Sequence, residues 1–262
     1  MASQSTSADY GNIPTIKPLL RKFRRRCSLY NLAGIFNPLF DIVVGADKRS
    51  VFYDIDKENP DLRRVDAAFP LVLDCLHRVL SAGRPAAYHT IDSDVIFSSG
   101  RGPSDVRWGV FVLHCFGKEP DAAQQLCPEL LALLRTIPRI YQAFFSVLEP
   151  GKSIPAHIGP TRSFLRYHLG LIVPTENTPT MRAKDEYYTW KTGESMLFDD
   201  SWDHEIYNNC KELRAVLIID VERKFPWPLQ LVANFMTTIG RMTYVPRVVA
   251  GANREFKFYT QG

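Results

Sequence analysis

Five short segments after Pro138 constrain most strongly what this chain can fold into. Each is rich in β-branched and aromatic residues, and turn residues separate it from the next: 141–148, 165–173, 194–198, 204–207 and 213–221. This spacing is typical of an antiparallel barrel or sandwich, in which short strands follow one another through tight turns. Residues 108–116, WGVFVLHCF, predict a further strand of the same sheet system.

Helices are predicted on either side of these strands in the sequence. Residues 67–80 alternate leucines with charged residues at helical spacing and end near Gly83. A second helix is expected over 121–137, interrupted at Pro128, and a third over 229–239. The expected fold class is therefore mainly β with flanking helices, an α+β arrangement.

The 262 residues fit one large domain, 29–262, behind a polar tail, 1–28. The net charge of +4 comes mainly from a basic segment in that tail, made of Arg21, Lys22, Arg24, Arg25 and Arg26. No basic surface interleaved with aromatic residues follows it, so we expect no nucleic-acid partner. A solvated segment is the preferred interpretation, and a weak contact with an anionic surface stays open.

The five cysteines are widely scattered and form no CxxC pair, which argues against a disulfide framework and a structural zinc site. The N-terminus lacks the apolar core of a signal peptide, and no apolar run reaches the roughly 18 residues of a membrane span. We therefore expect a cytoplasmic protein with reduced thiols and no transmembrane segment.

Two histidines follow strands in polar surroundings. His157 stands in PGKSIPAHIGP, a predicted loop that three prolines stiffen, so a ligand there would lose little entropy on binding a metal. His204 follows the polar turn FDDS, at the start of a short strand.

Two arginines lie on predicted strands. The strand period of two places Arg166 and His168 on one face of 165–171, opposite an apolar face. Arg214 begins an apolar strand and shares a face with Val216 and Ile218. Burial of a guanidinium there is costly unless an anion meets it, and a carboxylate fits its fork of donors best.

Each of these residues also has an ordinary structural explanation. A single strand histidine is more often a hydrogen-bonded core residue than a ligand, and either arginine could pair with an internal acid such as Asp199 or Asp200. Together, two loop histidines and two strand arginines on a β scaffold favour a metal that binds a dicarboxylate.

Residues 146–223 closely resemble the catalytic core of the aspartyl/asparaginyl β-hydroxylase family. The resemblance lies in the motif order FSVLEPG…HIGPT…LRYHLGL…W…GE…LFDDSWDHE…R…IIDV, with fainter similarity over 108–138. LRYHLGL and DVER also resemble the lipid A 2-hydroxylase branch. The resemblance implies a double-stranded β-helix (a cupin-like jelly roll), a catalytic core over about 108–223, and an Fe(II) enzyme that uses 2-oxoglutarate and O₂.

By the same resemblance, His157 and His204 are the iron ligands. Asp200 would orient a metal-bound water without binding the metal itself. The positions that hold 2-oxoglutarate in the family correspond to Ser146, Arg166, His168 and Arg214.

One position departs from the common pattern of oxygenases with this fold. Many of them bind Fe(II) through two histidines and a carboxylate two residues after the first histidine. Gly159 stands at that place here. The hydroxylase branch of the family also lacks the acid, whereas the lipid A branch has an Asp, so the chain resembles the hydroxylase branch at this site.

The predicted reaction is hydroxylation of an unactivated C–H bond, with release of succinate and CO₂. The expected substrate is an amino acid, an amino-acid residue or a small biosynthetic intermediate. A halogenase is an alternative because Gly159 leaves a coordination position that chloride could take, and a desaturase or cyclase acting on a natural-product precursor is another. A binding protein without turnover is disfavoured because both histidines and both arginines are present.

Overall fold

The computed structural model describes residues 29–92 and 106–259, so the basic tail lies outside the described residues. Two antiparallel sheets form its centre. The larger contains β1 (Phe52–Tyr53), β3 (Ala86–Ala87), β4 (Trp108–Cys115), β5 (Ile140–Leu148), β7 (Phe164–Ile172), β10 (Ser195–Phe198) and β12 (Arg214–Glu222). Its strand order is β1-β10-β7-β12-β5-β4-β3. The smaller contains β6 (Ile154–Ile158), β8 (Thr180–Ala183), β9 (Glu186–Thr189) and β11 (Asp203–Tyr207), in the order β6-β11-β8-β9.

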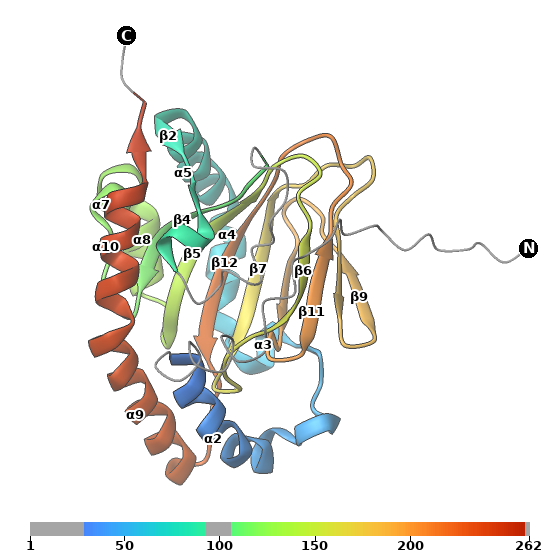
Figure 1. Ribbon diagram of the computed structural model, residues 1–262, viewed down its shortest axis with the longest axis vertical. Helices are drawn as coiled ribbons and strands as arrows, with labels where there is room; N and C mark the ends of the chain where they lie inside the picture. The colour runs from blue at the N-terminus through green and yellow to red at the C-terminus, as the bar shows by residue number, and fades with distance from the viewer. Residues whose placement is uncertain (1–28, 93–105, 260–262) are drawn as a thin grey trace, which may run out of the picture.

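The remaining elements flank the sheets (Figure 1). The helices are α2 (Leu29–Val44), α3 (Ile55–Glu58), α4 (Arg63–Ala67), α5 (Phe69–Ala82), α6 (Tyr88–Ile91), α7 (Asp121–Leu126), α8 (Pro128–Arg135), α9 (Trp227–Thr243) and α10 (Val245–Glu255). Two short 3₁₀ helices, η2 (Ala46–Lys48) and η3 (Pro60–Leu62), and a small ribbon of β2 (Gly83–Arg84) with β13 (Lys257–Phe258) complete the described residues. None of the described helices combines the length and the apolar character needed to cross a bilayer.

The larger sheet packs on helices with one face and on the smaller sheet with the other. Val72 of α5 and Leu130 of α8 share a buried cluster with Phe145 of the sheet. On the opposite face, Ile218 packs in a second cluster with Met181 of the smaller sheet. Figure 1 shows α7 and α8 on one side of the larger sheet and β6, β9 and β11 on the other. The predicted jelly roll with flanking helices is confirmed.

Strand β7 shows how the sequence period positions the site. Leu165, Tyr167 and Leu169 point into the cluster beneath the helices. The alternate residues Arg166 and His168 therefore face the smaller sheet, because successive strand side chains point to opposite faces. The predicted division of this strand into an apolar and a polar face is confirmed.

Several elements differ from the sequence expectations. His157, expected on a loop, lies in β6, where it pairs with β11. By contrast, the predicted interruption of the 121–137 helix at Pro128 is confirmed, because α7 ends at Leu126 and α8 begins at Pro128. α2 was not predicted because it is apolar on almost every side and shows no clear helical period.

Candidate active site

The two predicted iron ligands face each other across neighbouring strands. β6 and β11 pair with His157 opposite His204, and the centroids of their rings are 4.1 Å apart. Nδ1 of His157 lies 2.8 Å from the carbonyl oxygen of Pro155, and Nδ1 of His204 lies 2.9 Å from that of Trp202. A carbonyl oxygen only accepts, so each Nδ1 carries the proton and each Nε2 keeps its lone pair for a metal.

Burial keeps both rings neutral. It lowers the pKa of His157 to about 4, and it lowers the pKa of His204 well below its usual value, with the neighbouring His157 as a smaller cause. Within residues 29–92 and 106–259, no third His, Cys, Asp or Glu joins them in a metal-binding cluster. Two neutral imidazoles with fixed tautomers are therefore the protein donors that this site offers.

Gly159 makes room for the carboxylate of Asp200. Its backbone N–H donates to the carbonyl oxygen of Asp200 at 2.8 Å. A Cβ atom at position 159 would lie 2.5 Å from Cγ and from both carboxylate oxygens of Asp200. An acid at position 159 would therefore displace Asp200, which occupies the space next to the glycine.

Asp200 is held by Arg166. Its carboxylate is buried, which raises its pKa to about 7, while Arg166 acts in the opposite direction through an Nη1–Oδ2 contact of 3.1 Å. The other side of the guanidinium binds Asp220, with Nε–Oδ1 at 2.7 Å and Nη2–Oδ2 at 2.9 Å. Arg166 thus already has two carboxylate partners from this chain, the alternative that the sequence left open for either arginine. Its predicted role in holding 2-oxoglutarate stays a prediction.

The turn that carries Asp200 is fixed by its neighbour. Asp199 is fully buried and accepts from Arg49 Nε at 2.9 Å and from Arg223 Nη2 at 2.8 Å. It also accepts from the backbone N–H of Ser201 at 3.0 Å. This network connects the turn between β10 and β11 to β12 and to the segment after α2, so Asp200 and His204 are held in place from both sides.

The surroundings of Arg214 differ from those of Arg166. It is fully buried at the start of β12, and none of its three guanidinium nitrogens has a hydrogen-bond partner among the described residues. Burial lowers its pKa to about 9. Its guanidinium carbon lies 3.9 Å from the centroid of the Trp190 ring, a cation–π contact that compensates only part of the lost hydration. An anionic ligand would supply the acceptors that these donors lack within the described residues.

His168 and Trp190 extend this set of unpartnered donors. Both ring nitrogens of His168 and Nε1 of Trp190 are buried without a hydrogen-bond partner in the described part of the chain. The two rings stack with centroids 5.8 Å apart and planes 20° from parallel. Ser146 Oγ accepts from Trp108 Nε1 at 3.0 Å, so its own hydroxyl proton remains available to a ligand. Trp190 was missed as a site residue, and its only signal was the lone W of the family motif.

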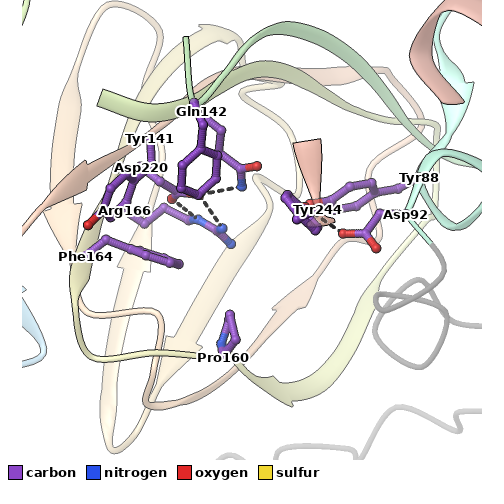
Figure 2. A pocket seen from close by; sticks show the side chains of 10 residues that line it. Tyr88, Asp92, Tyr141, Gln142, Pro160, Phe164, Arg166, Asp220 and Tyr244 are labelled. Atoms are coloured by element: carbon purple, nitrogen blue, oxygen red, sulfur yellow. Dashed lines mark hydrogen bonds and ion pairs between the residues drawn. The ribbon is translucent and has the colours of Figure 1, made fainter. Parts of the chain in front are cut away.

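A small pocket opens beside the Arg166–Asp220 pair. Figure 2 shows Arg166 and Asp220 on one side of it and Tyr88, Asp92 and Tyr244 on the other. The Tyr244 hydroxyl donates to Asp92 at 2.7 Å. The rest of the wall is mostly aromatic: Phe116, Tyr141, Gln142, Pro160 and Phe164. Sequence reasoning missed this pocket because its residues come from distant parts of the chain.

Comparison with known proteins adds independent findings. The chain is 32% identical over 210 residues to an ornithine lipid ester-linked acyl 2-hydroxylase from Rhizobium tropici, covering 77% of this chain and 72% of that protein. It is 34% identical over 119 residues to the aspartyl/asparaginyl beta-hydroxylase of Homo sapiens, covering 44% of this chain but only 16% of the human protein. A cupin domain of a transcriptional regulator from Enterobacter cloacae matches 32% of this chain and 82% of its own, at 12% identity and a TM-score of 0.27.

Residues 76–224, more than half of the chain, match the profile of the family described as Aspartyl/Asparaginyl beta-hydroxylase. The matched region includes both histidines, both arginines and the pocket residues between Tyr88 and Asp220. With its β-sandwich, its paired imidazoles and its match to the Rhizobium hydroxylase over most of both proteins, the chain belongs to the aspartyl/asparaginyl β-hydroxylase family.

Proposed function

We propose that this protein is a non-haem Fe(II) and 2-oxoglutarate dependent hydroxylase whose iron is held by His157 and His204. The observation that carries the proposal is a pair of neutral imidazoles with free Nε2 atoms on the same β-sandwich as Arg214, a buried guanidinium without a hydrogen-bond partner in the described residues. Imidazole nitrogen suits Fe(II), and the guanidinium fork suits a carboxylate.

The unpartnered donors fit 2-oxoglutarate as cosubstrate. We expect Arg214, with the Ser146 hydroxyl, to bind the carboxylate that is distant from the metal. His168 lies close enough to Arg214 for the guanidinium charge to lower the pKa of His168, after burial itself, and His168 would donate to the cosubstrate. Bound Fe(II), 2-oxoglutarate and O₂ would together supply the oxidant for a C–H bond, with succinate and CO₂ released.

The arrangement around Gly159 favours hydroxylation over halogenation. The space that the missing acid leaves lies against the Asp200 carboxylate, within 2.5 Å of where a Cβ atom would be. A chloride ion there would have to displace the Asp200 carboxyl group, which fills this buried space. A water molecule would instead find a hydrogen-bond acceptor in Asp200, so we expect water at this position.

The pocket favours an apolar substrate group. Among its lining residues Arg166 is the only cation, and Asp220 and Asp200 already neutralise it. An aspartyl carboxylate would need a cation of its own, whereas the aromatic wall suits a hydrocarbon chain. Of the two substrate classes that the relatives' names suggest, we therefore favour an acyl chain over an aspartyl or asparaginyl side chain. An amino acid or small intermediate is the second candidate.

The test combines cosubstrate binding with turnover. Under anaerobic conditions, Fe(II) and 2-oxoglutarate added to the protein should give a visible charge-transfer absorption band, and His157→Ala should lose it. With O₂, succinate formation should rise when an acyl ester is supplied, and the ester should gain one oxygen atom by mass spectrometry. An aspartyl peptide is the comparison substrate. Absence of the band in the unmodified protein would overturn the cofactor assignment, and stimulation by the peptide alone would overturn the acyl assignment.

A further inference from the structure

Helix α2 exposes an apolar stripe to solvent. Ile35 is 68% exposed and Ile42 is 79% exposed, with Leu39 and Val43 also exposed beside them. At 3.6 residues per turn, these four side chains lie within about 100° of arc on the helix surface. The opposite side of the helix is apolar as well, because Phe40 is fully buried in a local cluster.

Helix α9 repeats this pattern. Trp227 is 77% exposed and Met242 is 73% exposed, and Leu231 and Phe235 are exposed between them. These four residues lie within roughly 80° of arc. The buried side of α9 carries Ala233 and Met236, which pack in the same cluster as Phe40 of α2. A helix at a water-facing surface normally carries polar residues on its outer side. None of the exposed residues described in α2 is polar, whereas α9 exposes Asn234, Thr238 and Arg241 beside its apolar residues.

The two stripes form one surface. The ring of Phe36 in α2 meets that of Phe235 in α9 edge to face, with centroids 6.3 Å apart. Figure 1 shows α2 and α9 together at one end of the molecule. We define the α2/α9 face as Ile35, Leu39, Ile42, Val43, Trp227, Leu231, Phe235 and Met242. A joined apolar surface of this kind marks an interaction site rather than a surface made for water.

The charges near this face are mostly basic. In the sequence, the basic segment Arg21–Arg26 ends three residues before α2 begins. Lys224, just before α9, and Arg241, near its end, are exposed. The one charged residue within α2 is Asp41, and Arg162 neutralises it. Apolar stripes flanked by basic residues match the interfacial region of a bilayer that contains anionic lipids.

The same two helices hold the wall of the pocket. The side-chain amide of Asn37 in α2 donates to the carbonyl oxygen of Pro160 at 3.2 Å and accepts from the backbone N–H of Arg162 at 3.0 Å. Thr237 in α9 donates to the Tyr141 hydroxyl at 2.9 Å. Because Pro160 and Tyr141 both line the pocket, the protein-facing sides of α2 and α9 border its wall.

We propose that the α2/α9 face docks on an anionic membrane surface, with both helices in the plane of the interface, and that an acyl chain of a membrane lipid passes from there to the pocket. The stripes sit at the interface without spanning it, since the buried sides of both helices pack on the protein. The route of the acyl chain rests on the proposed function. The docking itself does not, because it requires no iron, cosubstrate or turnover.

The test is flotation of the full-length chain with vesicles of phosphatidylcholine alone or with added phosphatidylglycerol. We expect binding to both, stronger with phosphatidylglycerol. Trp227→Ser combined with Phe235→Ser should weaken binding at least about tenfold, because two apolar side chains no longer enter the interface. Tyr187→Ser is the matched control, since Tyr187 is an aromatic residue 66% exposed on β9, and it should change nothing. A triple variant should lose the preference for phosphatidylglycerol: Arg24→Gln, Arg25→Gln and Arg26→Gln. Each arginine removed should lower the affinity for phosphatidylglycerol vesicles about fivefold.

Two results would overturn the docking proposal. One is equal vesicle binding by the double variant and the Tyr187→Ser control. The other is absence of binding together with a dimer by light scattering that the double variant abolishes, which would assign the face to a second copy of the chain. The proposed function is tested separately by succinate formation with a water-soluble short-chain acyl ester, which the double variant should retain. Loss of docking and loss of the hydroxylase chemistry are therefore distinguishable.

Discussion

Replacement of Arg214 by methionine should have opposite effects on the free protein and on its complex with 2-oxoglutarate. In the free protein the guanidinium is fully buried without a hydrogen-bond partner among the described residues. Its contact with Trp190 compensates by about 2 kcal/mol. An apolar side chain of similar volume removes the burial cost of the charge, so the free energy of unfolding should be unchanged or should rise, by on the order of 1 kcal/mol.

In the presence of 2-oxoglutarate, Arg214→Met should instead be less stable than the unmodified protein. Loss of a buried, bidentate charged contact weakens binding by roughly 2 to 5 kcal/mol, which is about 30-fold to several thousand-fold in affinity. At a concentration of 100 times its dissociation constant, 2-oxoglutarate should stabilise the unmodified protein by about 2.7 kcal/mol, and the same concentration should stabilise Arg214→Met by about 0.9 kcal/mol at most.

Urea unfolding with and without 2-oxoglutarate, together with the KM for 2-oxoglutarate in a succinate assay, measures both effects. Arg49→Met is the matched control for stability, because Arg49 is also buried but donates to Asp199 at 2.9 Å. That variant should be less stable than the unmodified protein. An unchanged KM in Arg214→Met would refute the assignment of Arg214 to the cosubstrate, and a large loss of stability without 2-oxoglutarate would refute the claim that the buried charge lacks a partner.

Three further predictions concern the metal, the turn and the halide. His157→Ala and His204→Ala should each abolish Fe(II)-dependent turnover while the urea midpoint stays close to that of the unmodified protein; retained turnover in either variant removes that residue from the metal site. Asp199→Asn should lower the free energy of unfolding by about 3 to 5 kcal/mol, because Arg49 and Arg223 lose their buried counter-charge, and a loss below 1 kcal/mol would contradict this. Turnover in acetate buffer should be indifferent to added chloride, and a chlorinated product would replace the hydroxylase assignment with the halogenase.

Much of the fold was predictable from local patterns. The strands of the larger sheet alternate or run as apolar segments between turn residues, and β7 keeps the period of two that separates Arg166 and His168 from the core. Helix α5 shows a clear amphipathic period, and the break at Pro128 is a property of the proline ring. These features depend on residues close together in the sequence, so the sequence alone determines them.

The residues of the proposed site could be named from the sequence, but their hydrogen-bond and ion-pair partners could not. The sequence indicated that either arginine could bind an internal acid or an external carboxylate. Only the tertiary structure decided between these alternatives. The register of β7 on β12 places Arg166 beside Asp220, the turn at Asp200 adds a second carboxylate, and Arg214 has no hydrogen-bond partner among the described residues. Side-chain partners across strands depend on register, and register is fixed by the packing of the whole sheet.

The pocket and the α2/α9 face depend entirely on tertiary structure. Tyr88, Pro160 and Tyr244 come from three separate regions of the chain and meet in one wall. An apolar helix such as α2 has the same sequence signature whether its outer side is buried or exposed. Only the packing of α2 on α9 shows which of its apolar residues lie on the outside, because burial is a property of neighbours that the chain brings together from a distance.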